Sequence, residues 1–188
     1  METGPTTKGT ILRSLLKFVE RELPEPARAK AFASLPADDQ QLVTSGRVLS
    51  SDKISEFVLN RLTVAAARAK GETLDAFGRR AGRAELADAV GVYRFLTILL
   101  TPKALLHKAS TLWGSVHSHG KLLVEKETAN SALVRLIEFP SEDAHCARLT
   151  GWFEGAADMT GAKNASVVHT KCIVRGDSEC DWQLSWDK

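Results

Sequence analysis

The stretch His169–Cys180, which reads HTKCIVRGDSEC, decides the fold of the C-terminal part of the chain. Its polar centre around Gly176 predicts a turn, so Cys172 and Cys180 flank the turn of a β-hairpin. The third of the 3 cysteines, Cys146, lies near the start of an expected helix. Thiols gathered in this way in a reducing compartment indicate a metal site. Two simpler interpretations stay open: small buried apolar residues, or a cross-strand disulfide between Cys172 and Cys180.

The same alternation of apolar and polar residues extends to both sides of this hairpin. In its last strand one face carries Cys180, Trp182, Leu184 and Trp186, and the other carries Asp181, Gln183, Ser185 and Asp187. Leu122–Val124 and Leu133–Phe139 predict an earlier hairpin. Between the hairpins, a helix is expected from Ser141, its capping residue, to about Gly161. Residues 119–188 are therefore predicted to form a ββαββ unit.

The first 118 residues are predicted to be mainly helical, because their apolar residues recur at helical spacing. The expected helices are Thr10–Leu23, a short one after Pro36, Lys53–Lys70, Leu74–Phe77, Ala84–Val90, Val92–Leu100 and Lys103–Trp113. Pro24, Gly71 and Pro102 interrupt the pattern and mark ends. The predicted fold class is α+β, with a helical N-terminal half packed on an antiparallel sheet in one domain, 1–188.

Composition narrows the class of protein. The 188 residues are 44% hydrophobic, which is enough to bury a core without the help of disulfides or bound metals. The 25 basic and 23 acidic residues are interspersed and leave a net charge of +2, so no nucleic-acid partner is indicated. The sequence has no apolar stretch long enough to span a membrane and no secretory signal, so we expect a cytoplasmic protein.

Short motifs in the C-terminal third resemble the vinyl-reductase-type small-molecule-binding domains. The motifs are GWFEG at 151–155, VHTKC at 168–172, RGD at 175–177 and CDW at 180–182. These domains share a superfamily with haem nitric-oxide sensors and with subunits of the transport-particle tethering complex. The segments KGTIL at 8–12 and GVYR at 91–94 are similar to the helical part of uncharacterised bacterial members.

The resemblance implies a structural zinc site. Aromatic-sensing activators of this superfamily bind zinc through a set that falls here on Cys146, His169, Cys172 and Cys180, with a histidine where the activators have a carboxylate. Three thiolates and one imidazole form a closed tetrahedral set, which leaves no position for catalysis. In a regular strand His169 would point away from Cys172, so the site requires a β-bulge or an irregular strand entrance.

The function expected from these observations is a non-catalytic sensing or interaction module. Its apolar pocket for an unknown small hydrophobic ligand is expected to be lined by Tyr93, Trp113 and Trp152, which combine an apolar face with one hydrogen-bond donor. We expect no enzyme, because no phosphate loop, nucleophile–base pair or paired carboxylates are found.

Two alternatives stay open. In a haem-based gas sensor, His107, His117 or His119 would be the axial ligand. The haem sensors hold the propionates with a tyrosine–serine–arginine motif, but the single tyrosine here, Tyr93, has no serine two residues on. The other alternative is a scaffolding or tethering protein, because the apolar helices 11–19 and 92–100 predict a homodimer.

Overall fold

The computed structural model describes residues 4–90 and 101–187 of the chain. Its N-terminal part contains β1 (Thr6–Lys8), α1 (Gly9–Glu22), α2 (Glu25–Ala33), α3 (Ala37–Thr44), β2 (Lys53–Ser55), α4 (Glu56–Lys70) and α5 (Leu74–Val90). Its C-terminal part contains α7 (Pro102–Val116), β3 (Lys121–Glu125), β4 (Ser131–Ile137), α8 (Asp143–Met159), β5 (Lys163–Lys171), the 3-10 turn η2 (Ile173–Arg175) and β6 (Cys180–Asp187). This arrangement confirms the α+β class.

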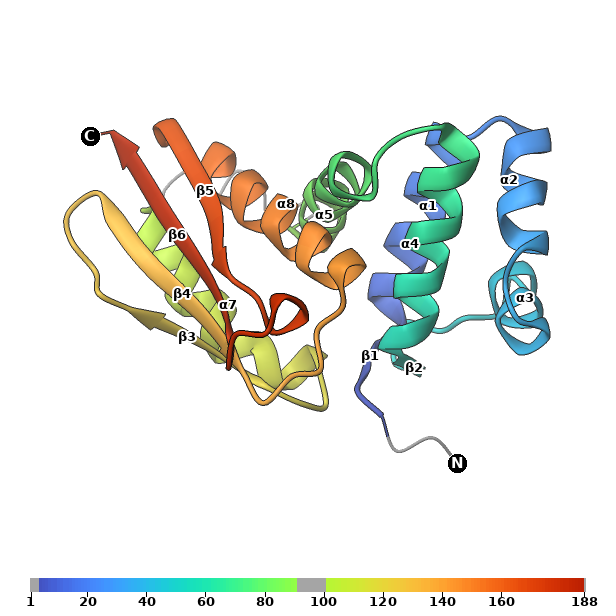
Figure 1. Ribbon diagram of the computed structural model, residues 1–188, viewed down its shortest axis with the longest axis horizontal. Helices are drawn as coiled ribbons and strands as arrows, with labels where there is room; N and C mark the ends of the chain where they lie inside the picture. Colours follow the sequence, from blue (N-terminus) through green and yellow to red (C-terminus); the bar gives the residue numbers. More distant parts are fainter. Residues whose placement is uncertain (1–3, 91–100, 188) are drawn as a thin grey trace.

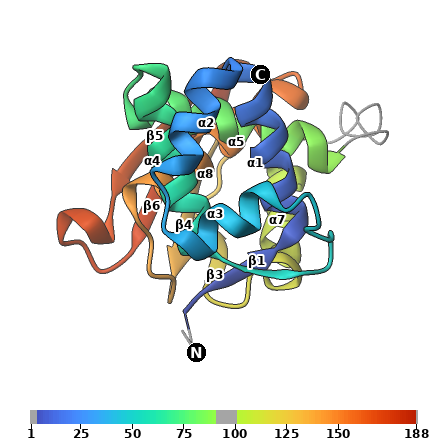
Figure 2. The same cartoon turned by 90° about the vertical axis from the view of Figure 1, so that its right-hand side faces the viewer.

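The C-terminal part is a four-stranded antiparallel sheet with helices packed on one face. The strand order is β3-β4-β6-β5, and α8 connects the two hairpins, which is the predicted ββαββ order. Helices α7 and α8 lie against the sheet, α5 lies against α8, and α1 and α4 follow behind α5 (Figure 1). Figure 2 faces the opposite end of the molecule, where α2 and α3 cover α1 and α4.

Two local expectations differ from the structure. No helix was expected over Glu25–Ala33, yet α2 begins immediately after Pro24. A proline that ends one helix also suits the start of the next, because its missing N–H needs no partner there. The helix expected over Lys53–Lys70 begins at Glu56, because Lys53–Ser55 pairs with β1. The expected helix Val92–Leu100 lies outside the described residues.

The interior has two large apolar clusters on either side of α5 and α8. The first joins α1, α4 and their neighbours, and fully buries Leu12, Leu15 and Val19 of α1. The apolar face of α1 is therefore covered within one chain and gives no argument for a homodimer. The second cluster joins the sheet to α7 and α8 around Phe153 and Trp182. Within the described ranges, none of the helices has the length and apolar character needed to cross a membrane.

Helices α5 and α8 are held at very close range by glycines. A Cβ added at Gly82 of α5 would lie 1.8 Å from the backbone oxygen of Arg148, and one at Gly151 of α8 would lie 1.9 Å from the backbone oxygen of Arg79. Glycine weakens a helix on its own, and the sequence analysis accordingly divided α5 into two segments. The packing against α8 overrides that local preference, so α5 runs unbroken from Leu74 to Val90.

We expect Gly151→Ala to lower the free energy of unfolding by about 3 kcal/mol, because the added methyl group must push two backbones apart. Gly114→Ala is the matched control: Gly114 also lies in a helix, but a Cβ there meets nothing within 4 Å. The control should be neutral or more stable by up to about 1 kcal/mol. Urea unfolding monitored by circular dichroism measures both changes, and equal stabilities would contradict the close packing.

Candidate functional site

A cavity of about 210 Å³ lies between the helical N-terminal part and the α7–α8–sheet part. Its walls are mostly apolar and come from α1, α5, α7, α8 and the start of β3. They are Ile11, Ala89, Ala109, Leu112, Trp113, Val116, Leu122, Leu149 and Trp152. The polar residues that line it are Glu56, Glu85, His117, His145 and Arg148. An apolar cavity with a few polar groups is the usual form of a small-molecule site.

The polar side of the cavity is organised by Arg148, which is 4% exposed. Its Nη1 donates to Glu85 Oε1 of α5 at 3.0 Å, and its Nη2 donates to Glu56 Oε2 of α4 at 3.2 Å. The same Nη2 also donates to Asn60 Oδ1 at 3.3 Å. One guanidinium on α8 therefore joins three helices, because its planar fork can serve several acceptors at once.

The two carboxyl groups around Arg148 differ in their acidity. Burial opposes ionisation of Glu56, but His117 and Arg148 outweigh it and lower the pKa of Glu56 from 4.5 to about 2. Burial dominates at Glu85 and raises its pKa, although Arg148 pulls in the other direction. A single guanidinium thus stabilises one of the two carboxylates well and the other poorly.

Two polar side chains in the cavity wall face each other. His117 Nδ1 lies 3.0 Å from Glu56 Oε1, and the two groups form an ion pair when the imidazole is protonated. Arg148 Nε and His145 Nδ1 are buried without a hydrogen-bond partner. Burial also lowers the pKa of His145 to about 3, so its ring is neutral.

The predicted pocket residues are placed as follows. Trp113 and Trp152 both line the cavity, Trp113 with its ring stacked on His117 at 4.0 Å between centroids. Tyr93 lies outside the described residues. The polar residues Glu56, Glu85 and Arg148 were not predicted. Of these three, only the burial of Arg148 could have been inferred from the sequence. Arg148 lies in a helix that is rich in small and apolar residues, which is typical of a buried helix.

A second candidate site lies near the start of α8, where Cys146 follows His145 of the cavity wall. The structure brings together Cys146, His169, Cys172 and Cys180, and one potential ligand atom from each lies within 4.8 Å of the others. The sulfur atoms are 3.8, 3.9 and 4.0 Å apart. A tetrahedral ion with metal–sulfur bonds of about 2.3 Å places its sulfurs about 3.8 Å apart. The spacing therefore suits a single metal ion.

His169 reaches the sulfurs because β5 is irregular at this point. The register of β5 on β6 shifts between His169 and Lys171, so Cys172 lies beyond a bulge. The ring of His169 stacks on Trp182 at 4.5 Å between centroids, and its Nε2 is buried without a hydrogen-bond partner. The register shift between His169 and Lys171 is an irregularity of the kind that the site requires.

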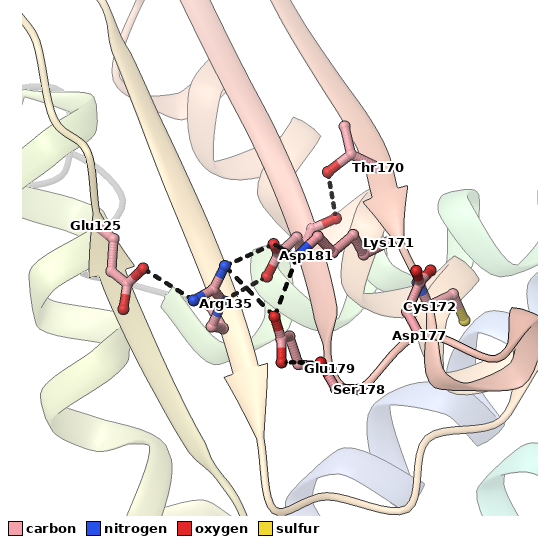
Figure 3. Close-up of polar contacts among 9 residues, drawn as sticks. All are labelled: Glu125, Arg135, Thr170, Lys171, Cys172, Asp177, Ser178, Glu179 and Asp181. Atoms are coloured by element: carbon pink, nitrogen blue, oxygen red, sulfur yellow. Dashed lines mark hydrogen bonds and ion pairs between the residues drawn. The ribbon is translucent and has the colours of Figure 1, made fainter.

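Charged residues brace the hairpin beside the cysteines (Figure 3). Arg135 of β4 donates from Nε to Asp181 Oδ1 at 2.8 Å and from Nη2 to Asp181 Oδ2 at 2.9 Å. Lys171 at the end of β5 donates to Glu179 at 3.2 Å. In the turn, the backbone N–H of Cys172 donates to Asp177 Oδ2 at 2.7 Å. These bonds fix the backbone on which Cys172 and Cys180 stand.

The three thiols do not ionise independently. The hydrogen bond with Cys180, together with burial, raises the pKa of Cys146. The reciprocal hydrogen bond from Cys146 lowers the pKa of Cys180 to about 4. One thiolate is therefore stabilised by the neighbouring thiol, whereas several thiolates side by side require a cation.

Comparisons with known proteins identify the fold. No family model matches the sequence, and no curated protein is similar to it in sequence. An unliganded Fe(II) H-NOX protein from K. algicida superposes with a TM-score of 0.75 at 15% identity, over 96% of this chain and 97% of that chain. The Fe(II)NO form of an H-NOX protein from S. oneidensis gives 0.72 at 15% identity, over 96% and 99%. The fold is that of the H-NOX proteins.

The IWP-051-bound H-NOX from Shewanella woodyi in its Fe(II)CO state shares the fold too, with a TM-score of 0.68 at 12% identity over 95% of this chain and 94% of that chain. These likenesses show a fold that the haem-NO sensors share, and they give no support to the vinyl-reductase branch named from the sequence motifs. They also correct the predicted cofactor, because the H-NOX structures are described by their iron and haem states and not by zinc.

The described residues leave a cavity that is too small and too acidic for haem, although two histidines line it. The cavity of about 210 Å³ is smaller than the roughly 300–1,000 Å³ of typical cofactor pockets. Glu56 and Glu85 line it, and carboxylates would repel the haem propionates. His107 lies outside the lining, exposed and paired with Glu127. Arg135 of β4 cannot take the place of the arginine that binds the propionates in the haem sensors. It alternates with the core-facing residues of its strand, so it lies on the outer face of the sheet, where it forms an ion pair with Asp181. His119 does not line the cavity either, whereas His117 and His145 do.

We expect Glu56→Gln to lower the free energy of unfolding by about 3 kcal/mol at neutral pH, because Arg148 then loses a buried ionised partner. The folded-state pKa of Glu56 is depressed from 4.5 to about 2, so the stabilisation is present above pH 4.5 and is lost as the pH falls through about 2. Urea unfolding across this pH range should therefore show the two proteins converging in acid. The exposed control Glu20→Gln should change stability by less than about 0.5 kcal/mol. A constant difference at every pH would contradict this origin.

Proposed function

We propose that this protein is a non-catalytic sensory module that binds a small molecule other than haem in the cavity between α5, α7 and α8. The supporting observation is the cavity itself, a mostly apolar space with a few polar residues in its wall. The H-NOX fold of the similar structures adds support, because those proteins bind ligands such as NO and CO at iron. The proposed role is sensory, as in the haem sensors, but the bound molecule is not haem.

The position of the cavity suits a sensor. Its lining includes Ile11 and Glu56 from the N-terminal part and Trp113 and Leu149 from the C-terminal part. A molecule bound there contacts both parts and favours the packing in which its contacts are best. A ligand shifts a conformational equilibrium only through such a difference in affinity.

Toluene tests the cavity, because a dry cavity of about 150 Å³ is known to accept one benzene ring. We expect toluene to raise the Tm, by about 3 °C for each kcal/mol of binding free energy. Ala109→Phe places a ring in the cavity and should abolish the effect. Ala104→Phe, on the exposed side of the same helix, should preserve it.

The same preparation is then titrated with haemin and followed by absorbance. No saturable Soret band at one haem per chain is expected, because the cavity is too small and is lined by carboxylates. A stoichiometric haem complex that Ala109→Phe abolishes would overturn the proposal and make the protein a haem-based gas sensor.

We also propose that Cys146, His169, Cys172 and Cys180 hold a metal ion that fastens the β5–β6 hairpin to α8. The support is the spacing of the four ligand atoms and the unpaired Nε2 of His169. A closed set of four protein ligands leaves no position for a reacting water, so the role is structural. The cluster borders a groove of about 550 Å³, through which an ion can enter the folded protein.

Cobalt(II) is a suitable probe, because cobalt bound to thiolates in a tetrahedral site absorbs visible light. We expect one Co(II) per chain with thiolate charge-transfer bands. His169→Ala and Cys172→Ser should each weaken binding by about 100-fold or more, since even the loss of a group that only orients a metal ligand costs about 10–100-fold. His107→Ala, a change at an exposed histidine outside the cluster, is the control. Bands of unchanged affinity in the two variants would place the metal elsewhere.

A further inference from the structure

The imidazole of His169 lies flat against the indole of Trp182. The two rings are nearly parallel, with 8° between their planes and 4.5 Å between their centroids. Trp182 is a fully buried residue of β6 and lies opposite His169 of β5 in the register of the sheet. An indole face that covers one side of the imidazole restricts the rotation of the histidine ring. The stack therefore sets the plane in which His169 offers a nitrogen to the cysteines.

His169 has open space beside it and needs such a support. Its strand, β5, is an edge strand of the sheet, and His169 lines the groove of about 550 Å³ that the metal cluster borders. A half-buried side chain next to open space loses conformational entropy when it is fixed in one rotamer. Its Nε2 is nevertheless buried without a hydrogen-bond partner. The stack on Trp182 holds the ring in this inward position.

The indole of Trp182 is itself fixed by hydrogen bonds that lead to a second cysteine–histidine cluster residue. Its Nε1 donates to Thr150 Oγ1 of α8 at 2.8 Å. Thr150 Oγ1 in turn donates to the backbone oxygen of Cys146 at 2.7 Å. Both Thr150 and Trp182 are buried, so water does not compete for these bonds. The path from His169 through Trp182 and Thr150 to Cys146 joins a ligand on β5 to a ligand on α8.

The position of His169 bears on which metal the site prefers. Thiolates are soft ligands, and an ion that favours sulfur can bind to the three cysteines alone. An imidazole nitrogen suits borderline divalent ions better than soft ones. Whether the site presents three sulfurs, or three sulfurs and one nitrogen, depends on how firmly His169 is held.

We infer that Trp182 is the positioning residue of this metal site: its indole holds the imidazole of His169 as the fourth ligand and so favours a borderline divalent ion over a soft one. The inference rests on the proposed metal site at Cys146, His169, Cys172 and Cys180. Trp182 has no metal-binding atom and acts through His169, with Thr150 as the anchor of its ring. Residues that orient a metal ligand in this way raise the metal affinity by about 10–100-fold.

The test compares cobalt(II), a borderline ion, with cadmium(II), a soft ion, on the full chain. The cobalt affinity is measured from the thiolate charge-transfer bands, and the cadmium affinity from the displacement of cobalt. Trp182→Leu removes the aromatic face against His169. In this variant we expect the cobalt affinity to fall by about 10–100-fold. The cadmium affinity should change by less than about threefold, because three thiolates suffice for a soft ion.

Two further variants and a matched control accompany this change. Thr150→Val keeps the side-chain shape but removes the hydroxyl group, so the preference for cobalt over cadmium should fall by about tenfold. Trp182→Phe keeps an aromatic face toward the imidazole and should restore most of the preference. Trp186→Leu is the control, because Trp186 is a buried tryptophan of the same strand and face that lines a small hollow with Pro102 and Leu106 instead. It should keep the preference of the unaltered protein.

A double variant separates positioning from a general loss of stability. Because Trp182 acts through His169, adding Trp182→Leu to His169→Ala should lower the preference no further than His169→Ala alone. Additive losses, or equal losses of both ions in Trp182→Leu, would overturn the inference and leave the metal site in place. If the unaltered protein binds neither ion through its thiolates, the proposed metal site fails together with the inference.

Discussion

The structure depends on one buried guanidinium. Arg148 projects from α8 toward α4 and α5 and hydrogen-bonds to Glu56, Asn60 and Glu85 at the boundary between the two apolar clusters. Apolar packing alone does not set the angle or register of helices, whereas a planar donor group with three acceptors allows few arrangements. The cost of burying this charge is offset only while all three partners stay in place, so the network specifies how the two parts meet.

The cavity follows from the same arrangement. Glycines at 82 and 151 bring α5 and α8 nearly into backbone contact, which leaves the space between α7, α8 and α1 unfilled. Arg148 is buried beside this space, and its partners become the polar wall. Packing, charge and cavity are thus one structural unit, in which a bound molecule contacts the elements that hold the two parts together. The chain has the H-NOX fold around the cavity, while the described residues that line it enclose a space that is small for haem and include two carboxylates.

Much of this architecture could be predicted from local patterns. The alternation from Cys180 to Trp186, the hairpin before it and the helix between the hairpins are periodic over enough residues to be recognised. The cysteine–histidine cluster could be predicted as well, because its members lie within 35 residues of one another. Their spacing also indicated that the strand is irregular near Lys171. The continuous α5 could not be predicted, since its glycines favour a break until α8 is present. The zinc cofactor was carried over from a motif resemblance, and the structures that share the fold are described by iron and haem instead.

The α+β class, the ββαββ order and the presence of a thiol-rich cluster follow from local features of the sequence, because period, turn residues and ligand spacing act over short stretches of chain. The buried network of Glu56, Glu85 and Arg148 exists only in the folded chain. These residues are separated by 29 to 92 positions along the chain, and each by itself resembles an ordinary charged residue on a helix surface. Their burial and their shared charge arise only when α4, α5 and α8 pack together.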